Sequence, residues 1–364
     1  MNVLQTIDTL YRGGSETLLL DYCRSAYKHG MNVTTVATGG GDLEQQYHSL
    51  PRYHFIPRTS VFDIRLVRSL RSILINDNID IVHTHQPVSA LHALAATIGL
   101  EKPVVHSIHG LVTDWKNKLA LRLAVQFTSR NIAVSESMIR MLQLYSVLPD
   151  IPNRSIVYNG IDITKFSNTT GTLRNELSIP ESAVLLGMVG NIYRMKDHAT
   201  ICTAVGILSQ DIPNVYCVFA GRIDEQDIYD ECIAIAKHYG IEDRIIFLGP
   251  RNDISTILCS LDTFVFSTVA DTFGIALIEA MIHRVPCLVS DIPAMCEITK
   301  DGKLARLFRA GDPQSLAEQL RQSFTQPKNE DSMKRIHDYA IEEFSIDAYC
   351  MRLKNLYTEV LNKT

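Results

Sequence analysis

The chain has 364 residues, of which 46% are hydrophobic, and this size and composition predict two domains, each with its own apolar core. The formal net charge is −5, which does not favour nucleic acid as a partner, so any basic binding site must be local. The eight cysteines form neither a CxxC pair nor a metal-ligand spacing, which favours reduced thiols in a cytosolic protein.

Short apolar runs alternate with longer segments of helical period along the first part of the chain. Helical periodicity is clear at 16–27 and 65–75, between runs that are typical of buried strands. This alternation is typical of βαβ units, which build a parallel sheet. The strands predicted here are 2–7, 31–37, 79–85, 103–108 and 131–135.

The alternation stops at 159–175, where Gly, Asp, Asn, Ser and Thr gather with few apolar residues, and we predict a linker there. It then resumes, which predicts a second doubly wound domain. A last helical segment at 345–361 follows the elements of that domain, and we expect it to return to the first one. The later strands are predicted at 183–190, 214–221, 244–249, 262–267 and 285–290. The predicted domains are 1–165 and 166–344, followed by the returning segment 345–364.

Ligands of parallel sheets bind beyond the carboxyl ends of the strands, so the loops there are candidate sites. Gly13 and Gly14 follow the first strand and precede a helix, whose free N–H groups can meet an anion or a hydroxyl. A plain tight turn explains the two glycines equally well. His85 and His109 follow neighbouring strands, so we expect them to converge on a polar ligand. No Ser–His–Asp or Cys–His pattern accompanies them, which favours hydrogen bonding over activation of a nucleophile.

A basic loop follows the first strand of the second domain. It contains Asn191, Arg194 and Lys196 directly after Gly190. Cationic side chains in this position can neutralise a phosphate without a metal ion, whereas a solvated basic loop is the alternative interpretation. The sequence has no Asp-x-Asp pair of the kind that holds a divalent ion on a diphosphate.

Two carboxylates flank a Phe–Gly pair in the run ADTFGIALIEAM, at 270–281. A helix that begins here leaves N–H groups free for a phosphate. Those groups belong to Phe273, Gly274 and Ile275. Asp271 precedes the helix and Glu279 lies on the face that starts at Ile275, so both can reach hydroxyls on either side of that phosphate. This predicts a ligand made of sugar, diphosphate and ribose. A helix cap at Asp271 and a solvated Glu279 are the alternative.

These motifs lie in the order found in retaining glycosyltransferases of family four, which the chain resembles over nearly its whole length. The motifs are GGSE, HSIHG, VYNGID, GNIYRMKDH, FAGR, FLGP and DTFGIALIEAM. The resemblance implies an α/β protein of GT-B fold, with two Rossmann-like doubly wound domains facing a cleft and a C-terminal helix that crosses back to the first domain. It also implies that the first domain binds the acceptor and the second binds the nucleotide sugar.

The resemblance implies roles for single residues as well. Glu279 matches the carboxylate that binds ribose hydroxyls, Asp271 the one that binds the transferred sugar, and His109 the histidine beside the reacting sugar. Gly13 and Gly14 match the Gly–Gly loop of the acceptor side.

Two positions depart from the family pattern. Asp271 stands where the motif usually has Glu, which leaves the identity of the donor open. Asn191 stands where the family has Arg, so the matching cation is Lys196, and Arg194 is a candidate substitute for the missing one.

We therefore expect a retaining, metal-independent glycosyltransferase without a cofactor. It would move a sugar from a nucleotide-diphosphate sugar to a hydroxyl of a glycan or lipid-linked acceptor, as in cell-surface polysaccharide synthesis. An epimerase of the same fold and a non-catalytic sugar-nucleotide-binding module are the alternatives. A nicotinamide-dependent oxidoreductase is disfavoured, because the first loop lacks the GxGxxG fingerprint.

The N-terminus lacks the pattern of a signal peptide, and no apolar run is long enough to span a membrane. We expect a cytoplasmic protein, with peripheral contact at the inner face of the cell membrane as a further hypothesis. The stretch around Trp115, Lys116, Lys118 and Arg122 is the candidate for that contact, and a solvated amphipathic helix is the alternative.

Overall fold

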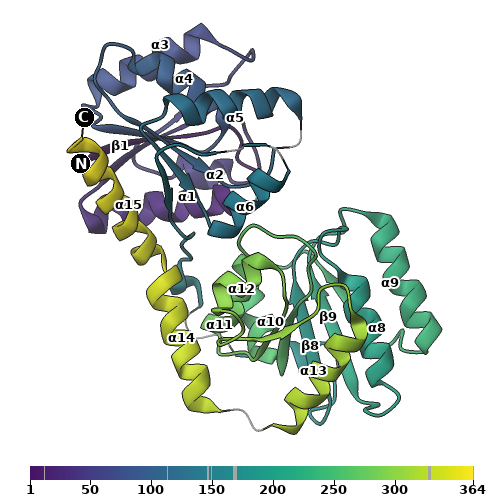
Figure 1. Cartoon of the computed structure of the whole chain (residues 1–364). Coiled ribbons are helices and arrows are strands. Elements are labelled where there is room, and N and C mark those ends of the chain that lie inside the picture. Colours follow the sequence, from purple (N-terminus) through teal and green to yellow (C-terminus); the bar gives the residue numbers. More distant parts are fainter. Residues whose placement is uncertain are drawn as a thin grey trace. The chain divides into compact units, whose positions relative to one another are not determined.

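The computed structural model describes residues 1–11, 13–112, 114–145, 147–148, 150–166, 170–326 and 329–363 (Figure 1). The chain divides into two compact units. Unit 1 comprises Met1–Asp162 and Glu343–Thr364, and unit 2 comprises Ile163–Glu342. Each unit is a parallel sheet with helices on its faces, which confirms the predicted α/β class (Figure 1).

Unit 1 contains a seven-stranded sheet in the order β3-β2-β1-β4-β5-β6-β7, and all its pairings are parallel. Because β1 lies between β2 and β4, the direction of winding changes there, and the loops after β1 and β4 meet at the carboxyl edge. The strands are β1 (Asn2–Ile7), β2 (Asn32–Ala37), β3 (Tyr53–Phe55), β4 (Ile81–Thr84), β5 (Val104–Ile108), β6 (Arg130–Ala133) and β7 (Arg154–Ile156).

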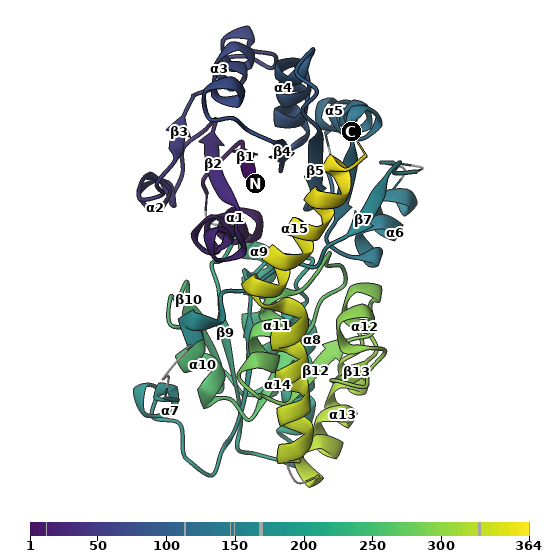
Figure 2. The same ribbon diagram turned by 90° about the vertical axis from the view of Figure 1, so that its left-hand side faces the viewer.

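The C-terminal helix belongs to the core of unit 1. Its side chains Tyr349, Leu353 and Tyr357 are buried in one cluster with residues of β1 and α1, and α15 lies beside α1 in both views (Figures 1 and 2). A Cβ on Gly160, in the VYNGID motif, would lie 2.6 Å from Cβ of Tyr349, so only glycine fits. The helices are α1 (Gly14–Ser25), η1 (Ala26–His29), α2 (Glu44–His48), α3 (Ile64–Asn76), α4 (Pro87–Thr97), α5 (Trp115–Phe127), α6 (Glu136–Leu144) and α15 (Ile346–Leu361).

Unit 2 contains a six-stranded parallel sheet in the order β10-β9-β8-β11-β12-β13. Here β8 lies between β9 and β11, so the loops after β8 and β11 are neighbours at the carboxyl edge. The strands are β8 (Val184–Val189), β9 (Val215–Ala220), β10 (Ile245–Gly249), β11 (Thr263–Phe266), β12 (Cys287–Ser290) and β13 (Arg306–Phe308). The helices are η2 (Ile163–Phe166), α7 (Leu173–Glu176), α8 (His198–Leu208), α9 (Gln226–Tyr239), α10 (Ile254–Ser260), α11 (Ile275–Ile282), α12 (Pro293–Thr299), α13 (Pro313–Thr325) and α14 (Glu330–Phe344).

All ten predicted strands occur, and the sequence analysis missed β3, β7 and β13. Each of these has three residues and lies at the edge of a sheet. Such strands bury few side chains, so they lack the apolar run that reveals a central strand. The predicted linker at 159–175 contains η2 and part of α7, and its residues 167–169 lie outside the described ranges.

Candidate active site

Lys196 and Asp271 meet at the carboxyl edge of unit 2. Lys196 belongs to the loop after β8 and Asp271 to the loop after β11, and Nζ lies 2.5 Å from Oδ2. The ammonium also lies 4.0 Å from the centroid of the Phe266 ring. Both side chains of the ion pair are largely buried, so the pair is held in a defined position. The topology thereby joins a cation and a carboxylate that are 75 residues apart in sequence.

Asp271 also organises the backbone that leads into α11. Its Oδ1 accepts hydrogen bonds from the N–H groups of Thr272, at 2.7 Å, and Phe273, at 3.1 Å. The expectation that the Phe273 N–H is free for an anion is therefore wrong, because the carboxylate already uses it. Asp271 therefore fulfils part of the capping role that was its alternative interpretation. It accepts hydrogen bonds from the N–H groups of the turn that precedes α11, and not from those of the helix itself.

The start of α11 keeps other donors free. Within the described part of the chain, the N–H groups of Gly274, Ile275 and Ala276 donate no hydrogen bond. Gly274 has φ of 87°, and a Cβ there would lie 2.6 Å from Cε of Met295. Only glycine therefore suits this helix entry, and the entry presents unpaired N–H groups of the kind that bind anions.

Glu279 lies further along α11 and is half-buried. Burial raises the pKa of its carboxyl to about 7, and Lys165 in η2 acts in the opposite direction. The carboxyl accepts no hydrogen bond from any described residue, whereas its backbone oxygen accepts one from His283. A poorly hydrated carboxyl without a donor is well suited to accept hydrogen bonds from ligand hydroxyls.

The two other candidate residues of the loop after β8, Asn191 and Arg194, are engaged at the surface. Asn191 Nδ2 donates to Asp224 Oδ2 at 2.9 Å, and its Oδ1 accepts from the Arg222 N–H. Arg194 is 70% exposed, and its Nη2 lies 2.9 Å from Oδ2 of Asp227 in α9. These surroundings are those of the solvated basic loop that was the alternative interpretation for Arg194.

The candidate histidines of unit 1 border a cavity of about 200 Å³ at the carboxyl edge of its sheet, whereas Gly13 and Gly14 do not line it. His85 and His109 lie on its wall, together with Ser15 at the start of α1. Gly13 is the N-cap of α1, and as a glycine it has no side-chain oxygen that could accept hydrogen bonds from the first N–H groups of the helix. The predicted convergence of the two histidines is observed, since His109 Nε2 lies 2.7 Å from His85 Nδ1. The residues around this cavity are His85, Gln86, Pro87, His106, Ser107, Ile108, His109, Gly110, Leu111, Val112, Leu121 and Ser15.

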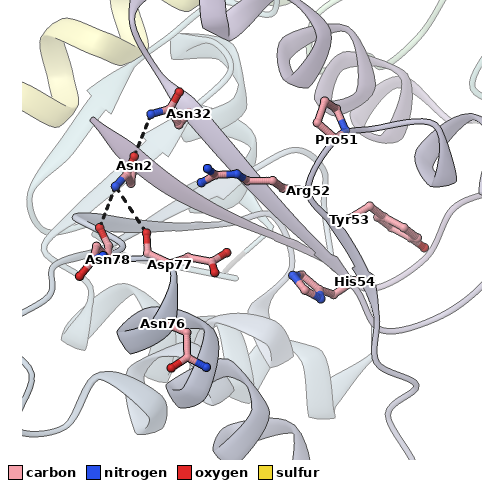
Figure 3. A pocket seen from close by; sticks show the side chains of 9 residues that line it. All are labelled: Asn2, Asn32, Pro51, Arg52, Tyr53, His54, Asn76, Asp77 and Asn78. Carbon is pink, nitrogen blue, oxygen red and sulfur yellow. Dashed lines mark hydrogen bonds between the residues drawn. The ribbon is translucent and has the colours of Figure 1, made fainter.

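A larger groove, of about 590 Å³, lies at the opposite edge of the same sheet, where β1 and β2 begin (Figure 3). Its amides serve the fold: Asn2 Nδ2 donates to the carbonyl of Asn78 at 3.0 Å, and Asn32 donates to Asn2 (Figure 3). The groove lies at the amino ends of the strands, whereas parallel sheets bind ligands at the carboxyl ends. We therefore place the candidate site at the other edge.

Sequence reasoning missed four contributors to these arrangements. Phe266 and Lys165 flank the unit 2 residues, and Gln5 and Tyr357 extend the histidine pair of unit 1. Only Gln5 carried a local signal, because it is a polar residue inside the apolar strand NVLQTI. The others come together through tertiary contacts between distant segments.

The sequence matches two family models that together span most of the chain. Residues 12–165 match Glycosyltransferase Family 4, and residues 170–342 match Glycosyl transferases group 1. The chain belongs to the family 4 glycosyltransferases. The prediction of a nucleotide-sugar-dependent transferase is thereby confirmed, and the epimerase and non-catalytic alternatives are not favoured. Retaining, metal-independent transfer fits this family generally.

The alignments with similar proteins extend over both units of the chain. The chain is 24% identical over 354 residues to the UDP-Gal:alpha-D-GlcNAc-diphosphoundecaprenol alpha-1,3-galactosyltransferase of Escherichia coli, covering 91% of this chain and 90% of that protein. It is 24% identical over 314 residues to the N-acetyl-alpha-D-glucosaminyl L-malate synthase of Bacillus anthracis, covering 82% of this chain and 80% of that protein.

A solved structure shares the complete fold. An Anabaena protein in complex with UDP and glucose superposes with a TM-score of 0.80 at 19% identity, over 98% of this chain and 99% of that protein. The likeness and the two parallel sheets confirm the predicted GT-B architecture of two Rossmann-like doubly wound domains. Within the described residues, no helix is both long enough and apolar enough to cross a bilayer.

Proposed function

We propose that this glycosyltransferase binds a nucleotide-diphosphate sugar in unit 2 and transfers the sugar, with retention, to a hydroxyl of a glycan or lipid-linked acceptor bound by unit 1. The observation that carries the proposal is the half-buried carboxyl of Glu279. Among the described residues, no donor bonds to this carboxyl, and the first N–H groups of its helix are unpaired as well. A ribose and a phosphate would supply the missing partners to both.

The proposed donor site combines three contacts. Glu279 accepts hydrogen bonds from the ribose hydroxyls, and the N–H groups of Gly274 and Ile275 meet the diphosphate. Lys196 shares its ammonium between Asp271 and that diphosphate, while Asp271 is also placed to bind hydroxyls of the transferred sugar. The Lys196 ammonium and the N–H groups of Gly274 and Ile275 stabilise the charge that develops on the departing nucleotide diphosphate. This stabilisation is the main catalytic requirement of such a transfer.

No protein nucleophile is needed in this mechanism. The acceptor hydroxyl attacks from the side that the leaving group vacates, and an oxygen of the departing phosphate takes its proton. His109 binds a hydroxyl of the sugar and so orients it. We propose that no metal ion is required, because Lys196 and the helix N–H groups neutralise the diphosphate.

Thermal unfolding with UDP, GDP and ADP, followed by transfer assays with their sugars, tests the donor site. One nucleotide should stabilise the protein by mass action, by about 2.7 kcal/mol at a hundredfold excess over its Kd. Transfer should persist in EDTA, and the product should keep the anomeric configuration of the donor. Stabilisation by none of the three, or activity that needs manganese, would refute the proposal. Release of an epimerised free sugar as the sole product would favour the epimerase instead.

We also propose that α5 contacts the membrane that carries a lipid-linked acceptor. Its solvent-facing side exposes Trp115, Leu119, Leu123 and Phe127, which recur at every fourth position. The helix contains basic residues and no acidic one, so it suits the interface of an anionic bilayer. In this setting the protein would lie at the cytoplasmic face of the cell membrane.

Trp115 is the only tryptophan of the chain, so its fluorescence reports this contact directly. Emission should shift to shorter wavelength with vesicles that contain phosphatidylglycerol and less so with pure phosphatidylcholine. Phe127→Ser should weaken cosedimentation with the anionic vesicles, whereas Ile98→Ser, at an exposed apolar residue outside α5, should not. Unchanged emission with both vesicle types would rule the contact out.

A further inference from the structure

A continuous chain of hydrogen bonds links α15 to His109 inside unit 1. Tyr357 lies 2.6 Å from Nδ1 of His83, and Gln5 Nε2 donates to the Tyr357 hydroxyl at 3.2 Å. Gln5 Oε1 lies 2.8 Å from His85 Nε2, and His85 Nδ1 lies 2.7 Å from His109 Nε2. Gln5, His83 and Tyr357 are fully buried, so water does not compete for these bonds.

The Gln5 amide determines the direction of every bond toward His109. Its Oε1 can only accept, so Nε2 of His85 must carry the proton of that bond. A neutral imidazole has one protonated nitrogen, so His85 Nδ1 is an acceptor. The partner of that acceptor, Nε2 of His109, must then donate. His109 is therefore left with its lone pair on Nδ1.

The other branch of this hydrogen-bond network agrees with the orientation of the amide in the structure. The Tyr357 hydroxyl accepts from Gln5 Nε2 and gives its own proton to His83 Nδ1. His83 then donates through Nε2 to Oγ of Ser107, at 2.7 Å. A reversed amide would reverse every one of these bonds and leave the proton of His109 on Nδ1. With the amide as the structure orients it, Gln5 Nε2 donates to Tyr357 and Oε1 accepts from His85, which leaves the proton of His109 on Nε2.

The imidazoles of His83, His85 and His109 are neutral at neutral pH. Burial lowers the pKa of His83 and His85 well below the usual range, and the neighbouring histidines lower it further. Burial lowers the pKa of His109 to about 4. A proton added to Nδ1 of His85 would face the Nε2–H of His109, so two donors would meet, which the network opposes.

We infer that Gln5, His85, His83 and Tyr357 are positioning residues that hold His109 as its Nε2–H tautomer, so that its Nδ1 meets the ligand as a hydrogen-bond acceptor. Nδ1 has no partner within the described part of the chain, and His109 lies on the wall of the 200 Å³ cavity. The group that binds there must bring a proton of its own. A sugar hydroxyl does so, whereas an ionised phosphate oxygen does not.

The inference rests on the proposed function in one respect, namely that the hydroxyl belongs to the transferred sugar. The C-terminal helix α15 contributes to this network as well, because it supplies the Tyr357 hydroxyl that bonds to Gln5 and His83. The histidine is thus prepared to select for a hydroxyl before any ligand arrives, which lowers the cost of orienting it on binding.

Nitrogen NMR of the full chain with ¹⁵N-labelled histidine tests the tautomer without any ligand. His109, assigned by the loss of its signals in His109→Gln, should show a protonated Nε2 and an unprotonated Nδ1, which resonates far downfield. A wild-type spectrum with the proton on Nδ1 would overturn the inference.

Variants of Gln5 test the positioning role. Gln5→Met keeps a similar volume but removes both polar atoms, and the His109 signals should move toward the average of the two tautomers. Gln5→Glu restores an oxygen acceptor for His85 and should restore the Nε2–H form. Thr84→Val is the matched control, because it removes a buried hydroxyl that bonds to His106, and neither residue belongs to the hydrogen-bond chain that ends at His109. A folded Gln5→Met with wild-type His109 signals would contradict the positioning role.

UDP, UDP-glucose and UDP-galactose then separate the inference from the proposed function. A hydroxyl donated to Nδ1 should shift its resonance upfield with one of the UDP-sugars and not with UDP. A matching rise in KM for that sugar, of two- to tenfold, is expected in Gln5→Met with a smaller change in kcat. A shift produced equally by UDP alone would indicate a phosphate contact and overturn the inference. Binding of neither these probes nor GDP or ADP would count against the proposed function, while the spectrum of the free protein still decides the tautomer.

Discussion

Replacing Glu279 by glutamine should stabilise the free protein and weaken nucleotide binding at the same time. The pKa of this carboxyl rises from 4.5 to about 7 because burial disfavours the charged form. At 1.36 kcal/mol per pH unit, this difference corresponds to a cost of up to about 3 kcal/mol when Glu279 is ionised. This cost already includes the opposing effect of Lys165, and glutamine avoids it.

The sign of the pH dependence follows from the raised pKa. Between pH 4.5 and 7 the folded protein binds more protons at Glu279 than the unfolded chain does, so this residue lowers the free energy of unfolding as pH rises. Glu279→Gln should therefore be more stable than the wild type by up to about 3 kcal/mol at pH 8, with little difference near pH 4.5. Urea unfolding followed by circular dichroism at both pH values measures the gain.

Nucleotide binding should change in the opposite direction. A charged acceptor forms stronger hydrogen bonds to ribose than an amide oxygen does, by about 1 to 2 kcal/mol, so Kd should rise about tenfold in Glu279→Gln. Isothermal titration with the nucleotide that stabilises the wild type measures this, and Glu242→Gln, at an exposed position, is the control. A variant that is equally stable at pH 8, or that binds the nucleotide as tightly as the wild type, would refute the reasoning.

Three further substitutions test the rest of the site. Lys196→Ala should lower kcat at least a hundredfold in the transfer assay while the protein still folds, because the developing charge loses its cation; a rate near wild type would exclude that role. Arg194→Ala should change kcat less than threefold, since this exposed side chain binds Asp227 at the surface; a loss as large as that of Lys196→Ala would instead identify it as the substitute cation. Gly274→Ala should destabilise unit 2 by about 1 to 3 kcal/mol, because alanine disfavours a φ of 87° and its Cβ would meet Met295; an unchanged thermal midpoint would show that the helix entry can relax.

The long-range partners of the site could not be predicted from local patterns. Apolar periodicity placed the central strands of both sheets, and the strand ends then indicated which loops to search, so His85, Lys196 and Asp271 were found. It did not indicate that Asp271 binds the Phe273 N–H, because this depends on the rotamer of one side chain. It also did not indicate that Arg194 is engaged with α9, which is 33 residues further along the chain.

The sequence by itself determined the class of protein, because strand and helix periodicities and the family motifs are local properties of the chain. Tertiary structure decided the chemical state of the site. Packing buries Glu279 without a donor and thereby raises its pKa, and it places Tyr357 of the last helix against His83. Such effects depend on the atoms that surround a group in space, and those atoms come from segments that are far apart in the sequence.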